Sequence, residues 1–381
     1  QTLQSHPSMS IEQVLEESSQ SRGALFEYLA EEVLVGLDQE IKNFLLPTSI
    51  LSKLDSETCD FLLNINNSDE ILRLLYRKGL FIEELRPGLW RYHQIFREFL
   101  NNRLHKSKMN VKNLHMKIAS YFRAHEYWEE AIYHLLSAEE FDQVNQILET
   151  IGDSMINDGR YESINYWINE IPEPIRENYP YLAYLLGEVN RYLENFEQAL
   201  ECYHKAERRY RIIKNNLGIS LALRGQGQVF LDTVRPINAD QHLQNALERL
   251  DPAEMPREYS DLLVLIAENQ LNLGKPENAE DLLNQANSLR SRLDMDTDLI
   301  QARIYLRTGR FQEGIDLLHE REANNQKLPP SRPQRFHRES PLLLSLFYSI
   351  VGDNENAEKY ALQGIEIGKM LQSTFVQSVG F

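Results

Sequence analysis

The feature that most constrains the fold of this chain is a spacing of small residues that recurs along most of its length. In the clearest copies a small residue is followed by a second after 12 positions and by a third after a further 7. These copies start at Ala119, Gly187, Gly227 and Ala267, and weaker ones start at Gly152, Ala302 and Ser345. Two small residues seven apart share one face of a helix, and the first residue fits a preceding helix. The spacing therefore predicts closely packed helical hairpins.

Glycines at the expected inter-helix turns support these hairpins. Gly159, Gly274, Gly309 and Gly352 fit the left-handed residue that ends a helix. Spacing and turns together are typical of tetratricopeptide repeats, strong in four copies and degenerate in three. We predict a mostly α chain whose hairpins stack into a right-handed tetratricopeptide-like α-solenoid with a concave inner surface. Because Ser373–Phe381 starts another helical pattern, we expect the array to continue beyond the chain.

The region before the repeats has a different pattern. Three short helical segments precede two strand-like runs around the turn Arg86–Gly88, and an amphipathic helix follows. Asp55 and Ser68 are expected helix N-caps, and Gly79 is an expected helix stop. Three helices, a hairpin and a closing helix predict a winged-helix domain. The predicted ranges are 37–107 for this domain, 108–175 for a helical arm with degenerate repeats, and 176–381 for the superhelical domain.

Charge and hydropathy exclude several kinds of partner. The net charge is −17, which argues against this chain being a nucleic-acid-binding surface. The third helix of the winged helix carries the mixed set Glu70, Arg73, Arg77 and Lys78, so we expect it to serve packing or switching rather than DNA binding. No run approaches the roughly 20 apolar residues of a membrane span, and the start is unlike a signal peptide. We expect a cytoplasmic protein without membrane contact.

The chain lacks the usual motifs of catalysis. It has no G-x-x-x-x-G-K-[ST] motif, and the sequence GQG at Gly225–Gly227 lies inside a repeat helix, where we expect it to bind no phosphate. His115, His125 and His134 are the nearest approach to a histidine cluster, and solvated or core histidines explain them better than a metal site. No serine or cysteine has a neighbouring His/Asp set. We expect no catalytic residue, metal or cofactor in this chain, and a hydrolase is a distant alternative.

Several segments resemble a known family. Leu25–Leu51, Leu74–Leu85 and Trp90–Leu100 are similar to segments of the large ATP-dependent LuxR-type (MalT-like) transcriptional activators, which belong to the signal-transducing STAND ATPases. His125–Phe141 resembles the first repeat of that family. The order of segments covers essentially the whole chain, although the detailed similarity fades after about Trp167.

The resemblance implies that the chain is an internal piece of a longer switch protein. Residues 1–36 would then be the helical tail end of a nucleotide-binding module. In this family ADP keeps the protein monomeric and closed, whereas inducer and ATP open it into an oligomer that activates transcription. Nucleotide with Mg, self-association and DNA binding through a C-terminal helix-turn-helix are therefore expected of the longer parent and not of this chain alone.

His93 lies between the second strand-like run and the amphipathic helix. In related switch ATPases a histidine at this junction contacts the β-phosphate of ADP. The resemblance therefore implies a nucleotide-sensing role for His93 when the nucleotide-binding domain is present. A histidine can donate a hydrogen bond to phosphate, and a helix N-terminus favours anions. The alternative is that His93 only caps the helix.

Polar and aromatic residues next to the first small residue of each repeat are expected to line the inner surface. They nominate seven effector-binding candidates: Tyr184, Glu188, Arg191, Arg224, Gln228, Glu268 and Arg303. We predict the inducer-sensing and autoinhibitory switch region of a bacterial transcription activator, binding a small-molecule inducer or a regulatory protein. The alternative is a tetratricopeptide protein-protein scaffold with a structural winged helix.

Overall fold

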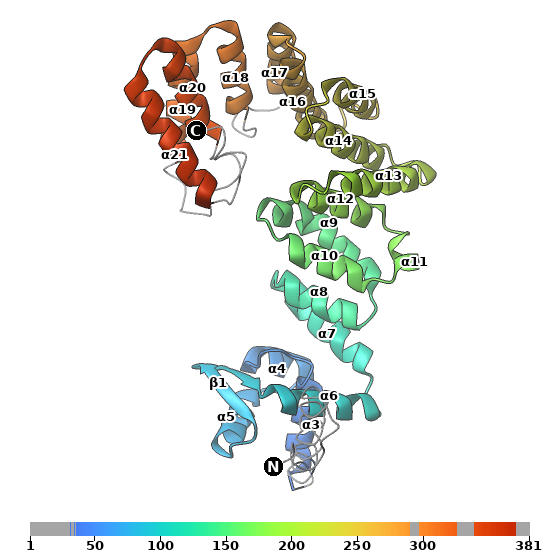
Figure 1. The fold of residues 1–381 in the computed structure, drawn as a ribbon. Coiled ribbons are helices and arrows are strands. Elements are labelled where there is room, and N and C mark those ends of the chain that lie inside the picture. The colour runs from blue at the N-terminus through green and yellow to red at the C-terminus, as the bar shows by residue number, and fades with distance from the viewer. Residues whose placement is uncertain (1–30, 32–33, 35, 290–296, 326–338, 371–381) are drawn as a thin grey trace, which may run out of the picture. The chain divides into compact units, whose positions relative to one another are not determined.

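The computed structural model describes residues 31, 34, 36–289, 297–325 and 339–370 (Figure 1). The chain divides into two compact units, Gln1–Ile147 and Leu148–Phe381. This division falls inside a helix and does not coincide with the predicted boundaries at 107 and 175, which stay a prediction. The predicted helical tail at 1–36 lies almost entirely outside the described residues, and the expected continuation at 373–381 lies wholly outside them.

The first unit begins with the predicted winged helix. Its elements are α3 (Gln39–Thr48), α4 (Ser56–Leu63), α5 (Ser68–Arg77), β1 (Ile82–Arg86), β2 (Leu89–Tyr92) and α6 (Gln94–Lys106). The strands pair antiparallel, and Leu54 adds an isolated bridge to Trp90. Asp55 caps α4 as predicted, because its side chain accepts a hydrogen bond from Thr58 N at 2.8 Å. The predicted cap at Ser68 is wrong by one position.

The cap of α5 is Asn67, and Ser68 is the first helical residue. The backbone N–H of Ser68 donates instead to the Asp60 side chain at 3.0 Å, so a residue of α4 satisfies a donor that sequence reasoning gave to a local cap. Gly79 has φ +63° and follows the helix end, as predicted. Helix boundaries commonly shift by a residue in this way.

The repeats follow as consecutive helix pairs. Their helices are α7 (Val111–Ala124), α8 (Trp128–Ser137), α9 (Phe141–Asn157), α10 (Tyr161–Glu170), α11 (Glu173–Arg176), α12 (Pro180–Tyr192), α13 (Phe196–Ile212), α14 (Asn216–Asp232), α15 (Pro236–Leu247), α16 (Pro256–Asn272), α17 (Pro276–Leu289), α18 (Asp298–Thr308), α19 (Phe311–Asn325), α20 (Glu339–Val351) and α21 (Asn354–Met370). Each predicted copy of the spacing falls on one such pair, with its first residue on the first helix. The mostly α fold class, a winged helix followed by a tetratricopeptide-like solenoid, is confirmed. No helix of the described residues is both long and apolar enough to cross a membrane.

The small residues act through close packing, as predicted. In the second unit the Tyr203 ring packs against Gly187 of α12 and Gly225 of α14, and a Cβ added to either glycine would overlap that ring. Gly227 lies against the Leu243 side chain in the same way. Gly225 and Gly227 therefore have a packing role, in which glycine lets helix axes approach closely.

The turns inside the helix pairs share one backbone conformation. In every copy the residue seven positions after the first small residue has a positive φ: Glu126, Gly159, Glu194, Val234, Gly274, Gly309 and Gly352. Four are the glycines predicted for these turns. Val234 stands out, because its φ of +54° is a conformation that β-branched residues rarely adopt. Its side chain is 76 % exposed, as is that of nearby Ile237 at 79 %.

Candidate functional site

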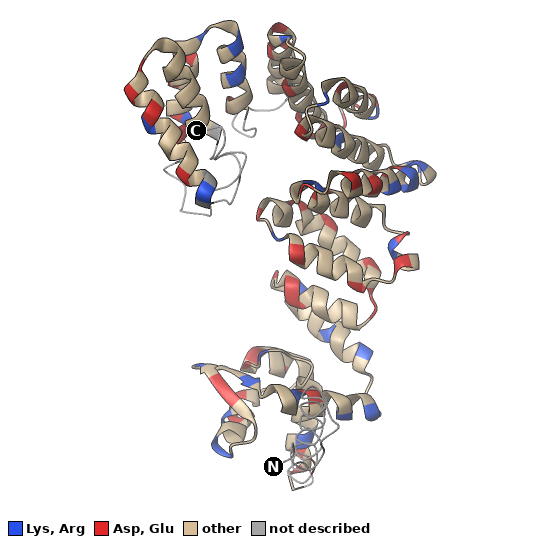
Figure 2. Cartoon of the chain, in the orientation of Figure 1, with Lys and Arg blue, Asp and Glu red and all other residues tan. Residues whose placement is uncertain are grey.

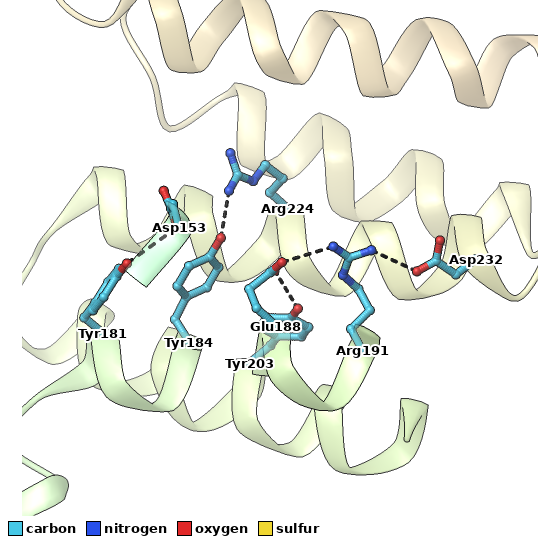
Figure 3. A network of polar contacts seen from close by, with 8 residues as sticks. All are labelled: Asp153, Tyr181, Tyr184, Glu188, Arg191, Tyr203, Arg224 and Asp232. Carbon is cyan, nitrogen blue, oxygen red and sulfur yellow. Dashed lines mark hydrogen bonds and ion pairs between the residues drawn. The ribbon is translucent and has the colours of Figure 1, made fainter. Parts of the chain in front are cut away.

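Helices α12 and α14 are the first helices of two neighbouring repeats, and they carry five of the seven predicted effector residues. On α12, Tyr184, Glu188 and Arg191 follow a spacing of four and three, so they share one face. On α14, Arg224 and Asp232 lie eight residues apart and also share a face. The two helices contact each other, and Figure 3 shows these side chains pointing toward one another.

Glu188 is the centre of a buried polar network (Figure 3). Its Oε2 accepts a hydrogen bond from Arg191 Nη2 at 3.0 Å, and its Oε1 accepts one from the Tyr203 hydroxyl at 2.7 Å. Arg191 Nη1 donates to Asp232 Oδ2 at 3.0 Å. Glu188 and Arg191 are each only 6 % exposed. The Arg191 guanidinium therefore joins a carboxylate of α12 to one of α14.

The electrostatics keep this network ionised near neutral pH. Burial by itself raises the pKa of Glu188, but the charges of Arg191 and Arg224 and the hydrogen bonds from Tyr203 and Arg191 hold that pKa below its usual value. Burial and the Glu188 charge raise the pKa of Tyr203, so its hydroxyl stays protonated and donates. Carboxylate, guanidinium and neutral phenol are the states that the hydrogen bonds require.

Arg224 lies beside the network but is only partly matched. Its Nη2 donates to the Tyr184 hydroxyl at 2.7 Å, while its Nε is buried without a hydrogen-bond partner. One turn along α14, Oε1 of Gln228 is also buried without a partner. Among the described residues no carboxylate forms an ion pair with Arg224. This face of α14 therefore carries polar groups that the described protein leaves unsatisfied.

The remaining two candidates form a separate pair. Arg303 of α18 donates to Glu268 of α16 at 2.8 Å, and both side chains are about one-third exposed. No hydrogen bond between described residues connects this pair to the network around Glu188. The seven candidates thus divide into a cluster of four, the neighbouring Gln228 and a distant ion pair. Their role in effector binding stays a prediction.

Sequence reasoning missed two members of the network. Asp232 lies four residues after Gln228, so extending the same helical face by one turn would have found it. Tyr203 belongs to the second helix of its pair, where the spacing predicts packing and gives no sign of a polar role. The available signal was the pair of glycines Gly187 and Gly225, which leave room for the Tyr203 ring between α12 and α14.

His93 lies at the junction predicted for it. Its backbone N–H donates to Phe81 O at 2.7 Å, and its carbonyl accepts from Arg97 N at 2.9 Å. The ring is exposed and makes no capping hydrogen bond, so within the described residues His93 does not cap α6 through its side chain. The first turn of α6 contains no acidic residue, which leaves its N-terminus suitable for an anion. The nucleotide-sensing role stays a prediction.

The third helix of the winged helix, α5, presents charges of both signs. Asp69 and Glu70 lie in its first turn, and Arg73 pairs with Asp69 at 2.8 Å. Figure 2 shows acidic and basic residues mixed over α5 and β1. A DNA-reading helix typically presents a basic face to phosphates. The mixed charge agrees with the prediction of a packing or switching domain.

Two of the three singled-out histidines form a core pair. His115 Nδ1 and His134 Nδ1 are 2.9 Å apart and buried. Burial lowers the pKa of His115 to about 4 and that of His134 to about 3, so both rings are neutral at pH 7. The interpretation of these two as core histidines is confirmed. No group of three or more metal-ligating side chains is found among the described residues.

Comparison with known proteins agrees with this architecture. The MalT winged helix domain family matches residues 30–110, the range that contains α3 to α6. The HTH-type transcriptional regulator MalT of Vibrio campbellii is 28% identical over 296 residues, which are 74% of this chain and 32% of that protein. The serine/threonine-protein kinase PknK of Mycobacterium tuberculosis is 24% identical over 270 residues, 67% of this chain and 24% of its own length. The chain thus spans about a third, or less, of these relatives.

A solved structure shares the fold of most of the chain. It is a Signal Transduction ATPase with Numerous Domains (STAND) protein with a tetratricopeptide repeat sensor, from Pyrococcus horikoshii. The TM-score is 0.70 at 16% identity, over 93% of this chain and 55% of that one. At this identity the likeness shows the fold alone. Together with the matched winged helix and the MalT relatives, it confirms the predicted resemblance: the chain is MalT-like, with a winged helix of the MalT type followed by tetratricopeptide-like repeats.

Proposed function

We propose that this chain is the effector-sensing region of a bacterial, cytoplasmic MalT-like transcription regulator, and that α12 and α14 supply the effector-binding face. The MalT-type winged helix and the tetratricopeptide-like repeats support a regulatory sensor region. The observation that carries the proposal for the site is the half-buried Arg224, whose guanidinium has one phenol as its hydrogen-bond partner and whose Nη1 is neither enclosed nor bonded to a described residue.

Unsatisfied polar groups below a protein surface are costly. A buried donor or acceptor without a partner destabilises the folded state by about 1–3 kcal/mol. Most such groups in folded proteins are paired. Arg191 also has a buried Nε without a partner, so the accessible Nη1, rather than Nε, distinguishes Arg224. An effector that accepts hydrogen bonds from the accessible Nη1 of Arg224 would bind this face and stabilise the folded repeats.

The same proposal gives the winged helix a switching role. In the longer protein His93 would contact a phosphate of bound ADP, because its ring is exposed and it begins a helix whose first turn lacks acidic residues. Effector binding would then favour ATP with Mg, self-association, and promoter binding through a separate helix-turn-helix. Among the described residues His93 fits this role through a free ring and a helix N-terminus.

A protein-binding scaffold is the second candidate. The observation that favours it is the exposed apolar pair Val234 and Ile237 at the turn between α14 and α15. Exposed apolar side chains that lie together mark interaction surfaces more often than single ones do. A protein partner would contact this turn rather than Arg224.

Thermal unfolding with a panel of sugars, nucleotides, amino acids, organic acids and short peptides separates the two candidates. A ligand of the folded state raises stability by about 2.7 kcal/mol at a hundredfold excess over its Kd. We expect at least one panel member to raise the midpoint of the wild-type chain, and Arg224→Gln to abolish that effect. Arg310→Gln is the matched control, because Arg310 is also a half-buried arginine of the second unit but pairs with Glu280.

The outcome for each candidate is distinct. A stabilisation that survives Arg224→Gln would contradict the proposed site. If no member of the panel stabilises the chain, the sensing proposal fails, and a partner whose binding is lost in Ile237→Asp would establish the scaffold instead.

A further inference from the structure

We propose that Arg224 receives a carboxylate group of the effector, so that the ligand class of this face is a small carboxylic acid. The inference rests on the proposed sensing function and deepens it by naming the chemistry of the ligand. It depends on how the charges of the network are paired, because each carboxylate near Arg224 already has another partner.

The arginines beside Glu188 are unequally matched. Arg191 binds two carboxylates, Glu188 and Asp232, each at 3.0 Å. Glu188 uses its second oxygen to accept from Tyr203. Arg224 has no ion pair with any described residue, and its hydrogen-bond partner is the neutral Tyr184 hydroxyl. One guanidinium of the network therefore has no direct ion pair, although the charges of Glu188 and Asp153 act on it from a greater distance.

The placement of Arg224 makes this unusual. Its side chain is half-buried, and burial opposes the charge of a guanidinium, although the nearby negative groups raise its pKa above the usual value. Arginine stays protonated under all ordinary conditions, so the charge cannot be removed by deprotonation. An anion that accepts hydrogen bonds from the accessible side of the guanidinium would give Arg224 the direct ion pair that it lacks.

The geometry of the guanidinium favours a planar anion. Nη2 donates to Tyr184, whereas Nη1 makes no hydrogen bond with a described residue and is not enclosed as Nε is. A carboxylate binds a guanidinium edge through two parallel N–H donors. Nη1 and the second N–H of Nη2 offer such an edge (Figure 3).

The local charge favours a carboxylate over a phosphate. A carboxylate carries one negative charge, so Glu188 and Asp153, which lie close to Arg224, repel it less than they repel a more highly charged anion. A phosphate monoester carries about 1.5 to 2 negative charges at pH 7, and Glu188 and Asp153 close to Arg224 would repel the excess. Gln228 lies one turn along the same helix face, and its amide Nε2 would donate a hydrogen bond to a neutral acceptor next to the carboxylate.

N-acetylglycine is a suitable probe, because it carries a carboxylate and, two atoms away, a neutral amide carbonyl. N-acetylglycinamide is its neutral counterpart, and inorganic phosphate tests the other anion. We expect N-acetylglycine to raise the unfolding midpoint and to bind, by titration calorimetry, at least about tenfold more tightly than the other two. The chain is used whole, at constant ionic strength.

Variants of Arg224 test whether N-acetylglycine binds at this side chain. Arg224→Gln should abolish the response to N-acetylglycine, and Arg224→Lys should restore it in part, since lysine keeps the charge but loses the two-pronged geometry. Arg310→Gln should respond as the wild type does. Circular dichroism of each variant establishes that the helices are intact, so that a lost response reports binding.

Failure of this inference is distinguishable from failure of the sensing function. If a neutral panel member stabilises the chain through Arg224 and N-acetylglycine does not, the site stands and the carboxylate is overturned. If N-acetylglycine and its amide stabilise equally, or if Arg224→Gln leaves the response unchanged, the proposal is likewise overturned.

Discussion

The two units of the molecule bury titratable side chains in opposite ways. In the first unit His115 and His134 face each other as neutral rings, one Nδ1 donating and the other accepting. In the second unit Glu188 and Arg191 are buried as an ion pair. The histidine pair satisfies itself, whereas the ion pair needs further partners from Tyr203 and Asp232.

Physical chemistry explains the difference. Histidine can give up its proton at a modest free-energy cost near pH 7, so burial makes it neutral. Arginine cannot, so each buried guanidinium must find an anion or remain unmatched. Arg191 forms direct ion pairs with two carboxylates, and Arg224 forms none with a described residue. The comparison teaches that a buried histidine pair can satisfy itself by losing its charge, whereas buried arginines depend on how the surrounding carboxylates are placed.

The largest expected effect comes from breaking the buried ion pair. Glu188→Ala should destabilise the chain by about 3–5 kcal/mol, because it leaves the Arg191 charge buried with one partner fewer. Urea unfolding measures the change. Glu268→Ala is the matched control, because Glu268 occupies the same place after the first small residue but its ion pair is part-exposed, so the loss should stay below about 1 kcal/mol. Equal losses in the two variants would contradict the comparison.

A second change acts on the packing that holds the network. Gly225→Ala places a Cβ against the Tyr203 ring, which is held between two helices, so we expect a loss of about 2–3 kcal/mol. Gly227→Ala meets flexible carbons of Leu243 and gains helix propensity, so its loss should be under about 1 kcal/mol. Chemical denaturation of the two variants gives both values, and a neutral Gly225→Ala would show that Tyr203 can move freely.

Mild acid tests the neutral pair. The pKa values of His115 and His134 are lower in the folded than in the unfolded state, so the unfolded chain binds more protons in acid. The contribution of the two neutral rings to the free energy of unfolding is present above about pH 6.5. It is lost as the pH falls toward the folded-state pKa values of about 4 for His115 and about 3 for His134. By pH 5 His115 alone accounts for a loss of about 2 kcal/mol. Glu188, whose pKa is below its usual 4.5, loses its contribution only in stronger acid.

Hydrogen exchange at pH 7 and pH 5, corrected for intrinsic rates, locates this loss. We expect faster exchange in α7 and α8 at pH 5, and no such acceleration in the double variant His115→Leu/His134→Leu. Acceleration that persists in the double variant would contradict the assignment to this pair.

The smallest effect concerns the shared turn conformation. Val234→Gly should stabilise the chain by up to about 1 kcal/mol, because glycine adopts the positive φ without the strain of a β-branched side chain. Gly274→Val, at the equivalent position of the next pair, should destabilise it by about 1–2 kcal/mol. Differential scanning calorimetry of both variants checks the opposite signs. A loss in Val234→Gly would mean that the exposed valine makes a contact that stabilises the fold.

The fold was largely readable from the sequence, because small-residue spacing and turn glycines act locally along each helix pair. The position of the α5 cap could not be predicted: the cap is Asn67 and not Ser68, because the Asp60 side chain in the preceding helix accepts the hydrogen bond from Ser68 N–H. The candidate face of α12 and α14 followed from helical periodicity. The pairing of the side chains could not be predicted. Arg191 contacts both Glu188 and Asp232 because α12 and α14 place the three side chains together, which the sequence does not show.

The central claim is that an effector binds the face formed by α12 and α14. Hydrogen exchange of the chain with and without the stabilising ligand identified in the panel tests it most directly. The account predicts that added protection concentrates in residues 180–192 and 216–232 and is absent in Arg224→Gln. Protection confined to the winged helix or to α18 through α21, or unchanged exchange in α12 and α14, would contradict it.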